Sequence, residues 1–189
     1  DVKGMEITAA MVKELRSQSG AGIMECKSAL KETSGDLEAA VTFLRKKGLA
    51  KADKKSDRQT GDGSVGTYIH AGNKLGVMVE LNCETDFVAN TPDFQELVRD
   101  IAMHIAAAKP RFATRDEVTQ EILDKEKEIA AHQAKESGKP DKIIEKIVSG
   151  KMEKFYEENC VLEQPFIKDT NITLEELIKQ KIALLGENI

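Results

Sequence analysis

Asp86 and Phe87 are the residues of this sequence whose types and position best suit chemistry on a partner. They lie in the stretch Asn82-Cys-Glu-Thr-Asp-Phe-Val-Ala-Asn90, after the apolar run Leu75–Leu81 and before an amphipathic segment that begins near Pro92. A carboxylate offers charge-assisted hydrogen bonds and an aromatic ring offers a wedge, and a tip held between two regular elements can aim both. The alternative is a connecting turn in which Phe87 folds back onto the core.

Other candidate catalytic groups form no recognised pattern. The histidines fall on a predicted strand and two predicted helices without metal-ligand spacing: His70, His104 and His132. Glu84 and Asp86 are carboxylates at i, i+2, a spacing that is common by chance. Cys83 is expected to be a buried apolar residue, and a nucleophilic pair with His70 is disfavoured because the two side chains are predicted on opposite faces of a sheet. The run from Gly20 lacks the Lys-Ser/Thr of a phosphate loop. We expect no enzymatic site, no cofactor and no metal.

The composition is that of a balanced, surface-rich protein. Among 189 residues, 40% are hydrophobic and 32% are charged, and the net charge of −5 comes from 28 basic and 33 acidic side chains. This balance argues against nucleic-acid binding through bulk charge, and 4% aromatic residues are too few for a base-stacking sheet. No apolar run approaches the roughly 20 residues that cross a bilayer.

The cysteines and the first residues favour a cytoplasmic setting. Three separated cysteines without a C-x-x-C pair indicate neither a zinc site nor a disulfide framework. The residues Asp1–Met5 lack the apolar core of a signal peptide, and Met5 is a candidate natural start.

Residues 8 to 48 are predicted to form three short helices. Thr8 can cap the first, and the run Ser19–Gly22 ends it because glycines adopt turn conformations cheaply. Asp36 can cap the third, and Gly48 is expected to end it. Apolar side chains recur at helical spacing, namely Met11, Val12 and Leu15, then Ile23, Cys26 and Leu30, then Leu37, Ala40, Val41 and Leu44. So thin a core suits an interaction module better than an enzyme.

Charged and small residues without apolar periodicity follow from Ala50 to Gly63, as expected of a domain boundary. We therefore predict one domain over residues 1–55 and an α+β core over residues 56–189. Its lysines could contact RNA or an acidic partner, but we predict that they belong to a solvated linker.

Two strands of alternating pattern come next, with Val65, Thr67 and Ile69 in the first and apolar residues at odd positions from Leu75 to Cys83 in the second. A two-residue loop would pair Ile69 with Gly76 and put the two apolar rows on opposite faces. A three-residue loop, Gly72–Lys74, pairs Ile69 with Val77 and puts both rows on one face. We predict the three-residue loop, since a one-residue slip inverts a sheet.

The remaining chain is predicted to be mostly helical. Thr91 and Pro92 begin a helix whose apolar stripe covers the sheet, formed by Phe94, Leu97, Val98, Ile101, Ala102 and Ile105, and Pro110 ends it. Residues 115–137 and 141–159, separated by Gly138-Lys-Pro140, predict an antiparallel helical hairpin. Residues 163–166 are expected to be irregular. Thr173 and Glu176 form a capping box for a last helix that stops at Gly186. The fold class is therefore α+β.

Two long motifs resemble a known family. Leu15-Arg16, the run Ser19-Gly-Ala-Gly-Ile-Met-Glu-Cys-Lys-Ser-Ala-Leu30, Gly35-Asp36 and Leu44-Arg45 are similar to the amino-terminal module of bacterial elongation factor Ts. The stretch Gly76–Ala89, with Glu80-Leu-Asn-Cys-Glu-Thr-Asp-Phe-Val88, is similar to the signature of the same family. The resemblance covers essentially the whole chain.

The resemblance implies a guanine-nucleotide exchange factor for elongation factor Tu, in its GDP-bound and nucleotide-free states, without active-site chemistry of its own. It implies a three-helix, ubiquitin-associated-like module that docks on the partner's nucleotide-binding domain through Leu15, Arg16, Gly20, Gly22, Ile23 and Met24. It also implies that Thr85, Asp86, Phe87 and Val88 dislodge magnesium, which would weaken the binding of GDP. No membrane and no direct nucleic-acid contact are implied.

Two departures from the family bear on assembly. The length allows a single core half, as in short members that dimerise through the core, so a homodimer is expected. The family usually continues past Gly186-Glu-Asn-Ile189 with a basic, aromatic strand, so this chain is expected to lack its last strand. The alternative function is a helical adaptor that binds a ubiquitin-like or nascent-chain partner. A remote third one is a thiol hydrolase that uses Cys83.

Overall fold

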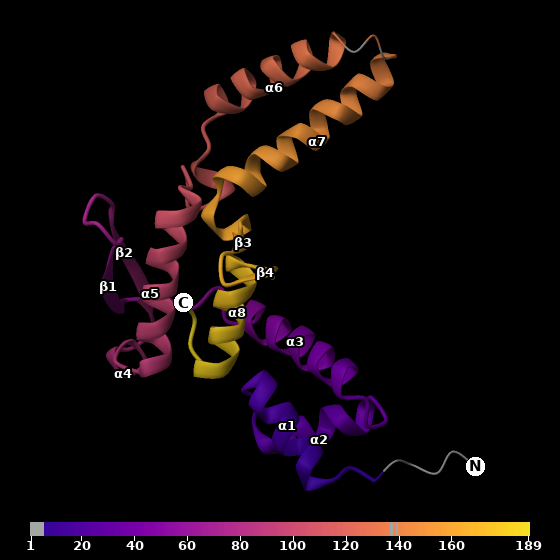
Figure 1. The fold of residues 1–189 in the computed structure, drawn as a ribbon, viewed down its shortest axis with the longest axis vertical. Helices are drawn as coiled ribbons and strands as arrows, with labels where there is room; N and C mark the ends of the chain where they lie inside the picture. Colours follow the sequence, from indigo (N-terminus) through magenta and orange to yellow (C-terminus); the bar gives the residue numbers. More distant parts are fainter. Residues whose placement is uncertain (1–5, 137, 139) are drawn as a thin grey trace. The chain divides into compact units, whose positions relative to one another are not determined.

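The computed structural model describes residues 6–136, 138 and 140–189 (Figure 1). The predictions about Asp1–Met5 and Lys139 lie outside the described residues. The elements are α1 (Ala9–Ser19), α2 (Ile23–Glu32), α3 (Leu37–Asp53), β1 (Asp62–Ile69), β2 (Gly76–Cys83), α4 (Asp86–Ala89), α5 (Pro92–Ala108), η1 (Arg115–Glu117), α6 (Gln120–Lys135), α7 (Asp141–Asn159), η2 (Val161–Glu163), β3 (Pro165–Phe166), β4 (Asp169–Thr173) and α8 (Leu174–Leu185). The strands form two separate two-stranded sheets, β1-β2 and β3-β4. The predicted α+β class is confirmed.

The described residues fall into two compact units. Unit 1 comprises the chain up to Val65, Glu80–Val98 and Ile178–Ile189, and unit 2 comprises Gly66–Val79 and Arg99–Leu177. Whether a boundary near residue 55 separates independently folding domains stays a prediction.

Helices α1 and α3 begin at the predicted caps, and α1 ends at Gly20, within the predicted Ser19–Gly22 run. The Thr8 hydroxyl accepts from the Met11 N–H at 3.3 Å, and the Asp36 carboxylate accepts from the Ala39 N–H at 2.9 Å. The buried side chains of this module are Leu15, Cys26, Ala29, Leu30, Ala40 and Leu44. The placement of Ile23 in the apolar stripe of α2 is wrong, because its side chain is 56% exposed. The inward face of α2 begins one turn later, at Cys26.

The predicted end of α3 at Gly48 is also wrong, because the helix continues to Asp53. A glycine costs about 1 kcal/mol relative to alanine inside a helix. Packing within unit 1 explains why it is tolerated: a methyl group on Gly48 would lie 3.4 Å from the Ala183 Cβ of α8. Lys179 of α8 also pairs with Asp53 at 2.9 Å. The first residues of the predicted linker are therefore helical.

The hairpin of β1 and β2 has a different register from the one predicted. The His70 N–H donates to the Leu75 carbonyl at 2.9 Å, and a methyl group on Gly76 would lie 2.9 Å from Ile69 Cδ1. Ile69 is therefore opposite Gly76, and the loop has four residues. Gly72 and Asn73 have φ angles of 92° and 56°, and these left-handed conformations reverse the chain within the loop.

This register sends the two apolar rows to opposite faces of the sheet. In β1 the odd positions from Val65 to Ile69 are exposed, whereas Ser64, Gly66 and Tyr68 are half-buried. In β2 the odd positions face inward as predicted, down to the fully buried Cys83. The expectation that both apolar rows share a face is wrong here, because Ser64, Gly66 and Tyr68 take the inward positions of β1.

Helix α5 begins and ends as predicted. The Thr91 hydroxyl accepts from the Phe94 N–H at 3.2 Å, and Lys109, with a φ of 50°, ends the helical path before Pro110. The predicted stripe is buried at Phe94, Leu97, Val98, Ile101 and Ala102, with Ile105 half-buried. In unit 1, the Gln95 amide donates to the Ser64 hydroxyl at 3.2 Å, which attaches the start of α5 to β1.

Helices α6 and α7 form the predicted antiparallel hairpin (Figure 1). Ala130 and Ala134 are the buried residues of α6, while Ile129 of α6 and Ile143 of α7 are exposed. At the base of the hairpin, Val118, Met152, Phe155 and Cys160 form an apolar cluster.

Arg115 fastens the base of this hairpin. Its guanidinium lies 4.2 Å from the centre of the Tyr156 ring and pairs with Glu153 at 2.8 Å and Glu163 at 2.5 Å. These hydrogen bonds to Glu163 and Glu153 raise the pKa of Arg115 above its ordinary value. The side chain is partly exposed, so its contribution to stability is small.

Residues 163–166, predicted to be irregular, include the short strand β3. It pairs with β4 in antiparallel fashion, with Pro165 opposite Thr173 and a bulge before Phe166. Two residues that start with proline are too short to show the alternation by which strands are found.

His104 of α5 holds the chain around this small sheet within unit 2. Its Nε2 lies 3.0 Å from Gln164 Oε1, and the Ile167 N–H donates to its Nδ1 at 3.4 Å. The proton is therefore on Nε2. His104 is fully buried, and this burial lowers its pKa from 6.5, against a smaller opposing effect of the Gln164 hydrogen bond. One turn earlier on α5, Asp100 pairs with Lys168 at 2.6 Å.

Helix α8 is capped at both ends as predicted. The Thr173 N–H donates to Glu176, and the Glu176 N–H donates to the Thr173 hydroxyl, both at 3.2 Å. Gly186, with a φ of 82°, ends the helix. In unit 1, Lys181 pairs with Asp93 of α5 at 2.9 Å, so the second half of α8 lies against the start of α5.

Candidate functional site

Asp86 and Phe87 form the exposed side of the short helix α4. Thr85 is in extended conformation, with a φ of −137°, and its hydroxyl caps the Val88 N–H at 3.5 Å. Phe87 is 83% exposed, so its ring does not fold back onto the core. Asp86 is exposed as well, and Val88 is half-buried. The connecting-turn alternative for Phe87 is therefore wrong.

Helix α4 has 4 residues, and so short a helix is unstable by itself because nucleation is costly. Its terminal carbonyl groups are instead bound by side chains that follow it in sequence. The Asn90 amide donates to the Asp86 carbonyl at 2.8 Å, the Thr91 hydroxyl to Val88 at 2.7 Å, and the Gln95 amide to Ala89 at 2.7 Å. These bonds give the exposed ring of Phe87 a fixed base.

The first residue of the site is bound by the far end of the chain. The Thr85 N–H donates to Glu187 Oε2 at 3.0 Å, and the Thr85 hydroxyl donates to Glu187 Oε1 at 2.6 Å. Both oxygens of one carboxylate are thus used by one residue. Thr85, predicted to act on the partner's magnesium site, is half-buried and has its hydroxyl occupied in this structure.

The neighbouring residue Glu84 is held in the same way. It accepts from the Asn188 N–H at 2.7 Å and pairs with Arg58 at 3.4 Å. The hydrogen bond from Asn188 and the charge of Arg58 lower the pKa of the Glu84 carboxyl group. Glu84 is thus engaged within the chain, which leaves Asp86 as the exposed carboxylate between Asn82 and Asn90.

The predicted docking residues of the three-helix module divide into exposed and buried ones. Ile23 and Met24 are 56% and 75% exposed at the start of α2, and Arg16 is exposed on α1. Gly20 ends α1 with a φ of 66°. Gly22 is the N-terminal cap of α2. Leu15 is fully buried and supports this surface from below.

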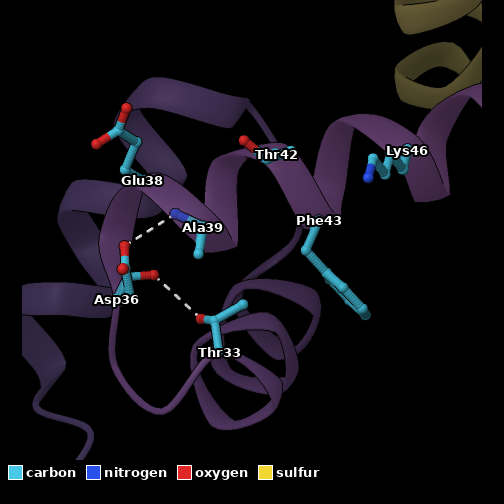
Figure 2. A pocket seen from close by; sticks show the side chains of 7 residues that line it. All are labelled: Thr33, Asp36, Glu38, Ala39, Thr42, Phe43 and Lys46. Atoms are coloured by element: carbon cyan, nitrogen blue, oxygen red, sulfur yellow. Dashed lines mark hydrogen bonds between the residues drawn. The ribbon is translucent and has the colours of Figure 1, made fainter.

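A pocket of the same module lies where α3 begins (Figure 2). It is lined by Thr33, Asp36, Glu38, Ala39, Thr42, Phe43 and Lys46. The Thr33 hydroxyl donates to the Asp36 carbonyl at 3.0 Å, and the Asp36 carboxylate caps Ala39. These polar groups are occupied by the turn that starts α3, so no reaction is assigned to the pocket.

Cys83 is not suited to nucleophilic catalysis. It is fully buried, its thiol donates to the Thr85 carbonyl at 3.1 Å, and burial raises its pKa. The predicted reason against a Cys83–His70 pair needs correction, because Tyr68 and His70 share the inner side of β1 and are hydrogen bonded at 3.0 Å. The pair is still disfavoured, since His70 precedes the hairpin turn and Cys83 ends β2.

Among the residues that the structure describes, no three His, Cys, Asp or Glu side chains are grouped as metal ligands. No helix in the described ranges combines the length and apolarity that a membrane span needs.

Glu187 and Asn188 are the site residues that sequence reasoning missed. The predicted stop at Gly186 correctly placed them after a helix, but Glu187 is 102 residues from Thr85 in sequence. A hydrogen bond over that separation has no periodic or local signal by which the sequence could reveal it.

The comparisons with known proteins agree with the resemblance seen in the motifs. The family model described as Elongation factor TS matches residues 8–188. The chain is 59% identical over 184 residues to a protein named Elongation factor Ts from Solibacter usitatus, covering 97% of this chain and 87% of that protein. It is 58% identical over 185 residues to the protein of that name from Fervidobacterium nodosum, covering 98% and 94% of the two chains.

Proposed function

We propose that this chain, which belongs to the elongation factor Ts family and is thus a translation elongation factor, promotes the release of GDP from elongation factor Tu in the cytoplasm. In this proposal, the chain binds the GDP-bound and nucleotide-free partner and disturbs its magnesium and phosphate site. It performs no covalent chemistry of its own.

The observation that carries the proposal is the exposure of Phe87 on a helix held at both ends. An aromatic ring that is 83% exposed costs hydration free energy that burial in a partner would recover. Asp86 lies beside it and is also exposed. Magnesium bridges a nucleotide-binding protein and its phosphates, so an inserted ring and carboxylate that displace its ligands would weaken GDP binding. By linkage, GDP must weaken the binding of the exchange factor by the same ratio.

The exposed residues at the start of α2 are proposed as a second contact. Ile23 and Met24 offer exposed apolar side chains at the start of α2, Arg16 is exposed on α1 of the same module, and arginine is enriched among the residues that dominate interface energies. We assign docking on the partner to this surface and nucleotide release to α4.

The test is the release of a fluorescent GDP analogue from elongation factor Tu, measured by stopped flow with the intact chain and its variants. Phe87→Ala should slow stimulated release by about tenfold or more, since a buried aromatic anchor is worth about 2 kcal/mol and 1.4 kcal/mol corresponds to a factor of ten. Asp86→Ala should slow it to a similar degree through loss of a charged acceptor.

A matched control is Ile143→Ala, which truncates an exposed apolar side chain on α7. It should leave the release rate unchanged. Unchanged release by Phe87→Ala would refute the role of α4. Binding of the partner without any acceleration by the wild-type chain would instead support the helical adaptor.

We also propose a homodimer formed through the outer face of the β1-β2 sheet. In unit 2, Ile69 and Met78 are 61% and 76% exposed on this face, and exposed apolar side chains that lie together mark interaction surfaces. Met78→Lys should shift the sedimentation coefficient from dimer to monomer at micromolar concentration. A monomeric wild-type chain under the same conditions would contradict the dimer.

A further inference from the structure

We propose that Glu187 and Asn188 are positioning residues of the exchange site, which fix the turn that aims Asp86 and Phe87 at the partner. This inference rests on the function proposed for α4. Glu187 and Asn188 follow α8 and contact other residues of this chain. They would therefore act on the partner only through α4.

Glu187 determines how the chain enters α4. Its carboxylate accepts two hydrogen bonds from Thr85, one from the backbone at 3.0 Å and one from the hydroxyl at 2.6 Å. Hydrogen bonds to an ionised acceptor are about twice as strong as neutral ones. One of these bonds is to the backbone of Thr85 and the other to its hydroxyl, so together they fix both the position of Thr85 and the rotation of its side chain.

Asn188 extends this attachment to a third segment of unit 1. Its N–H donates to Glu84 at 2.7 Å, and its side-chain amide donates to the carbonyl groups of Ser56 at 3.2 Å and Arg58 at 2.8 Å. The residues before α4, those after α3 and those after α8 are thereby joined at one place. The turn before Asp86 is restrained from two sides.

Helix α4 needs this restraint at its start more than at its end. Three side chains bind its terminal carbonyl groups, as described above, whereas the cap at its start is a long contact of 3.5 Å between the Thr85 hydroxyl and the Val88 N–H. Without Glu187, the Thr85 carbonyl keeps its hydrogen bonds from the Cys83 thiol at 3.1 Å and the Ala89 N–H at 3.2 Å, but the Thr85 N–H and hydroxyl both lose their acceptor. A ring that must enter a partner in one orientation loses effectiveness when its base can rotate, because binding then has to order it.

Gly186 makes the attachment possible. Its φ of 82° is in the left-handed region, where any residue with a side chain is strained, and it turns the chain out of α8 so that Glu187 meets Thr85. The Gly186 N–H closes the helix on the Ile182 carbonyl at 2.9 Å.

The test is Glu187→Gln in the intact chain, assayed by release of fluorescent GDP from elongation factor Tu. Glutamine keeps the shape but removes the negative charge and one of the two acceptor atoms, so the two charge-assisted hydrogen bonds to Thr85 are weakened. The maximal release rate should fall about fivefold to tenfold. The concentration for half-maximal stimulation should change little, because the contact made by α2 is intact. Glu157→Gln, an exposed glutamate of α7, is the matched control and should have no effect.

A second experiment distinguishes a positioning role of Glu187 from a general loss of stability. In a chain that already carries Asp86→Ala and Phe87→Ala, Glu187→Gln should have no further effect on release, since no side chains remain to be aimed. An equal loss in both backgrounds, or a melting temperature lowered by more than a few degrees, would overturn the positioning role.

The outcomes also separate this inference from the proposed function. If Phe87→Ala slows release but Glu187→Gln does not, only the positioning role is wrong. If Phe87→Ala itself has no effect, the assignment of exchange to α4 is wrong, and any effect of Glu187→Gln has another cause.

Discussion

Two long-range hydrogen-bonded anchors in this chain can be compared, one in each compact unit. The His104 anchor joins α5 to the chain around β3 through Gln164 and Ile167. The Glu187 anchor joins the end of α8 to Thr85, ahead of α4. Both connect residues far apart in sequence, 60 residues in the first case and 102 in the second.

The two anchors differ in burial and charge. His104 and Gln164 are buried and neutral, so each of their buried polar atoms needs a hydrogen-bond partner within the protein. Thr85 and Glu187 are half-buried, and the acceptor is a carboxylate that water can also solvate. Breaking the buried anchor therefore leaves unsolvated groups, whereas breaking the surface anchor mainly frees a turn. We expect the first to control stability and the second to control the orientation of α4.

The largest effect is expected from His104→Ala. It removes a buried ring and leaves Gln164 Oε1 without its donor, which together should lower the free energy of unfolding by about 2–4 kcal/mol. Urea denaturation followed by circular dichroism would measure it. His132→Ala, at an exposed histidine of α6, should stay within about 0.5 kcal/mol of wild type. Equal losses of unfolding free energy from the two substitutions would show that the buried hydrogen bonds of His104 add no stability.

Acid should destabilise the chain through the same residue. Burial lowers the pKa of His104 below 6.5, so the unfolded state takes up a proton more readily than the folded one. The stability that neutral His104 contributes is complete above pH 6.5 and is lost as the pH falls from there toward the lowered pKa. A proton on Nδ1 would also lie against the Ile167 N–H, which donates to that atom in the folded state. The Asp100 carboxylate, one turn earlier on α5, is already paired with Lys168.

Melting temperatures between pH 7.5 and pH 5 would measure this loss, which should be smaller than that of the truncation because no atoms are removed. The variant His104→Asn should show a flatter profile over the same range. A wild-type profile as flat as that of the variant would rule out His104 as the titrating group.

Thr85→Val should lower the free energy of unfolding by a smaller amount, about 1 kcal/mol, because water can replace a hydrogen bond at a half-exposed position. Thr119→Val is a matched control: Thr119 caps α6 through the Ile122 N–H at 3.4 Å, but no carboxylate is bound to it in the structure described. The difference between the two losses estimates what Glu187 adds. If Thr85→Val cost as much as His104→Ala, the distinction between the anchors would fail.

The smallest effect on stability is expected from Phe87→Ala, within about 0.5 kcal/mol, because the ring is 83% exposed. Thermal melting of the purified variant would check it. A drop of several degrees would mean that Phe87 packs on the chain in solution, and slower GDP release by this variant would then not identify a contact with the partner.

The sequence by itself determined the ends of most helices. Thr8, Asp36, Thr91 and the Thr173–Glu176 box all act on N–H groups within three residues, so their effect is local and visible in the order of the residues. The buried stripe of α5 and the hairpin of α6 and α7 follow from periodicity in the same way. The motif that carries the candidate site, Thr85–Val88, was likewise apparent from its composition and from its place between two regular elements.

Only the tertiary structure decided the features that depend on a distant neighbour. Gly48 stays helical because Ala183 packs on it, and the hairpin register places Ser64, Gly66 and Tyr68, and not the apolar row of β1, on the inner face. Thr85 is oriented by Glu187, 102 residues later. Local signals cannot report such choices, because the free energy that decides each one comes from a contact between segments far apart in the chain.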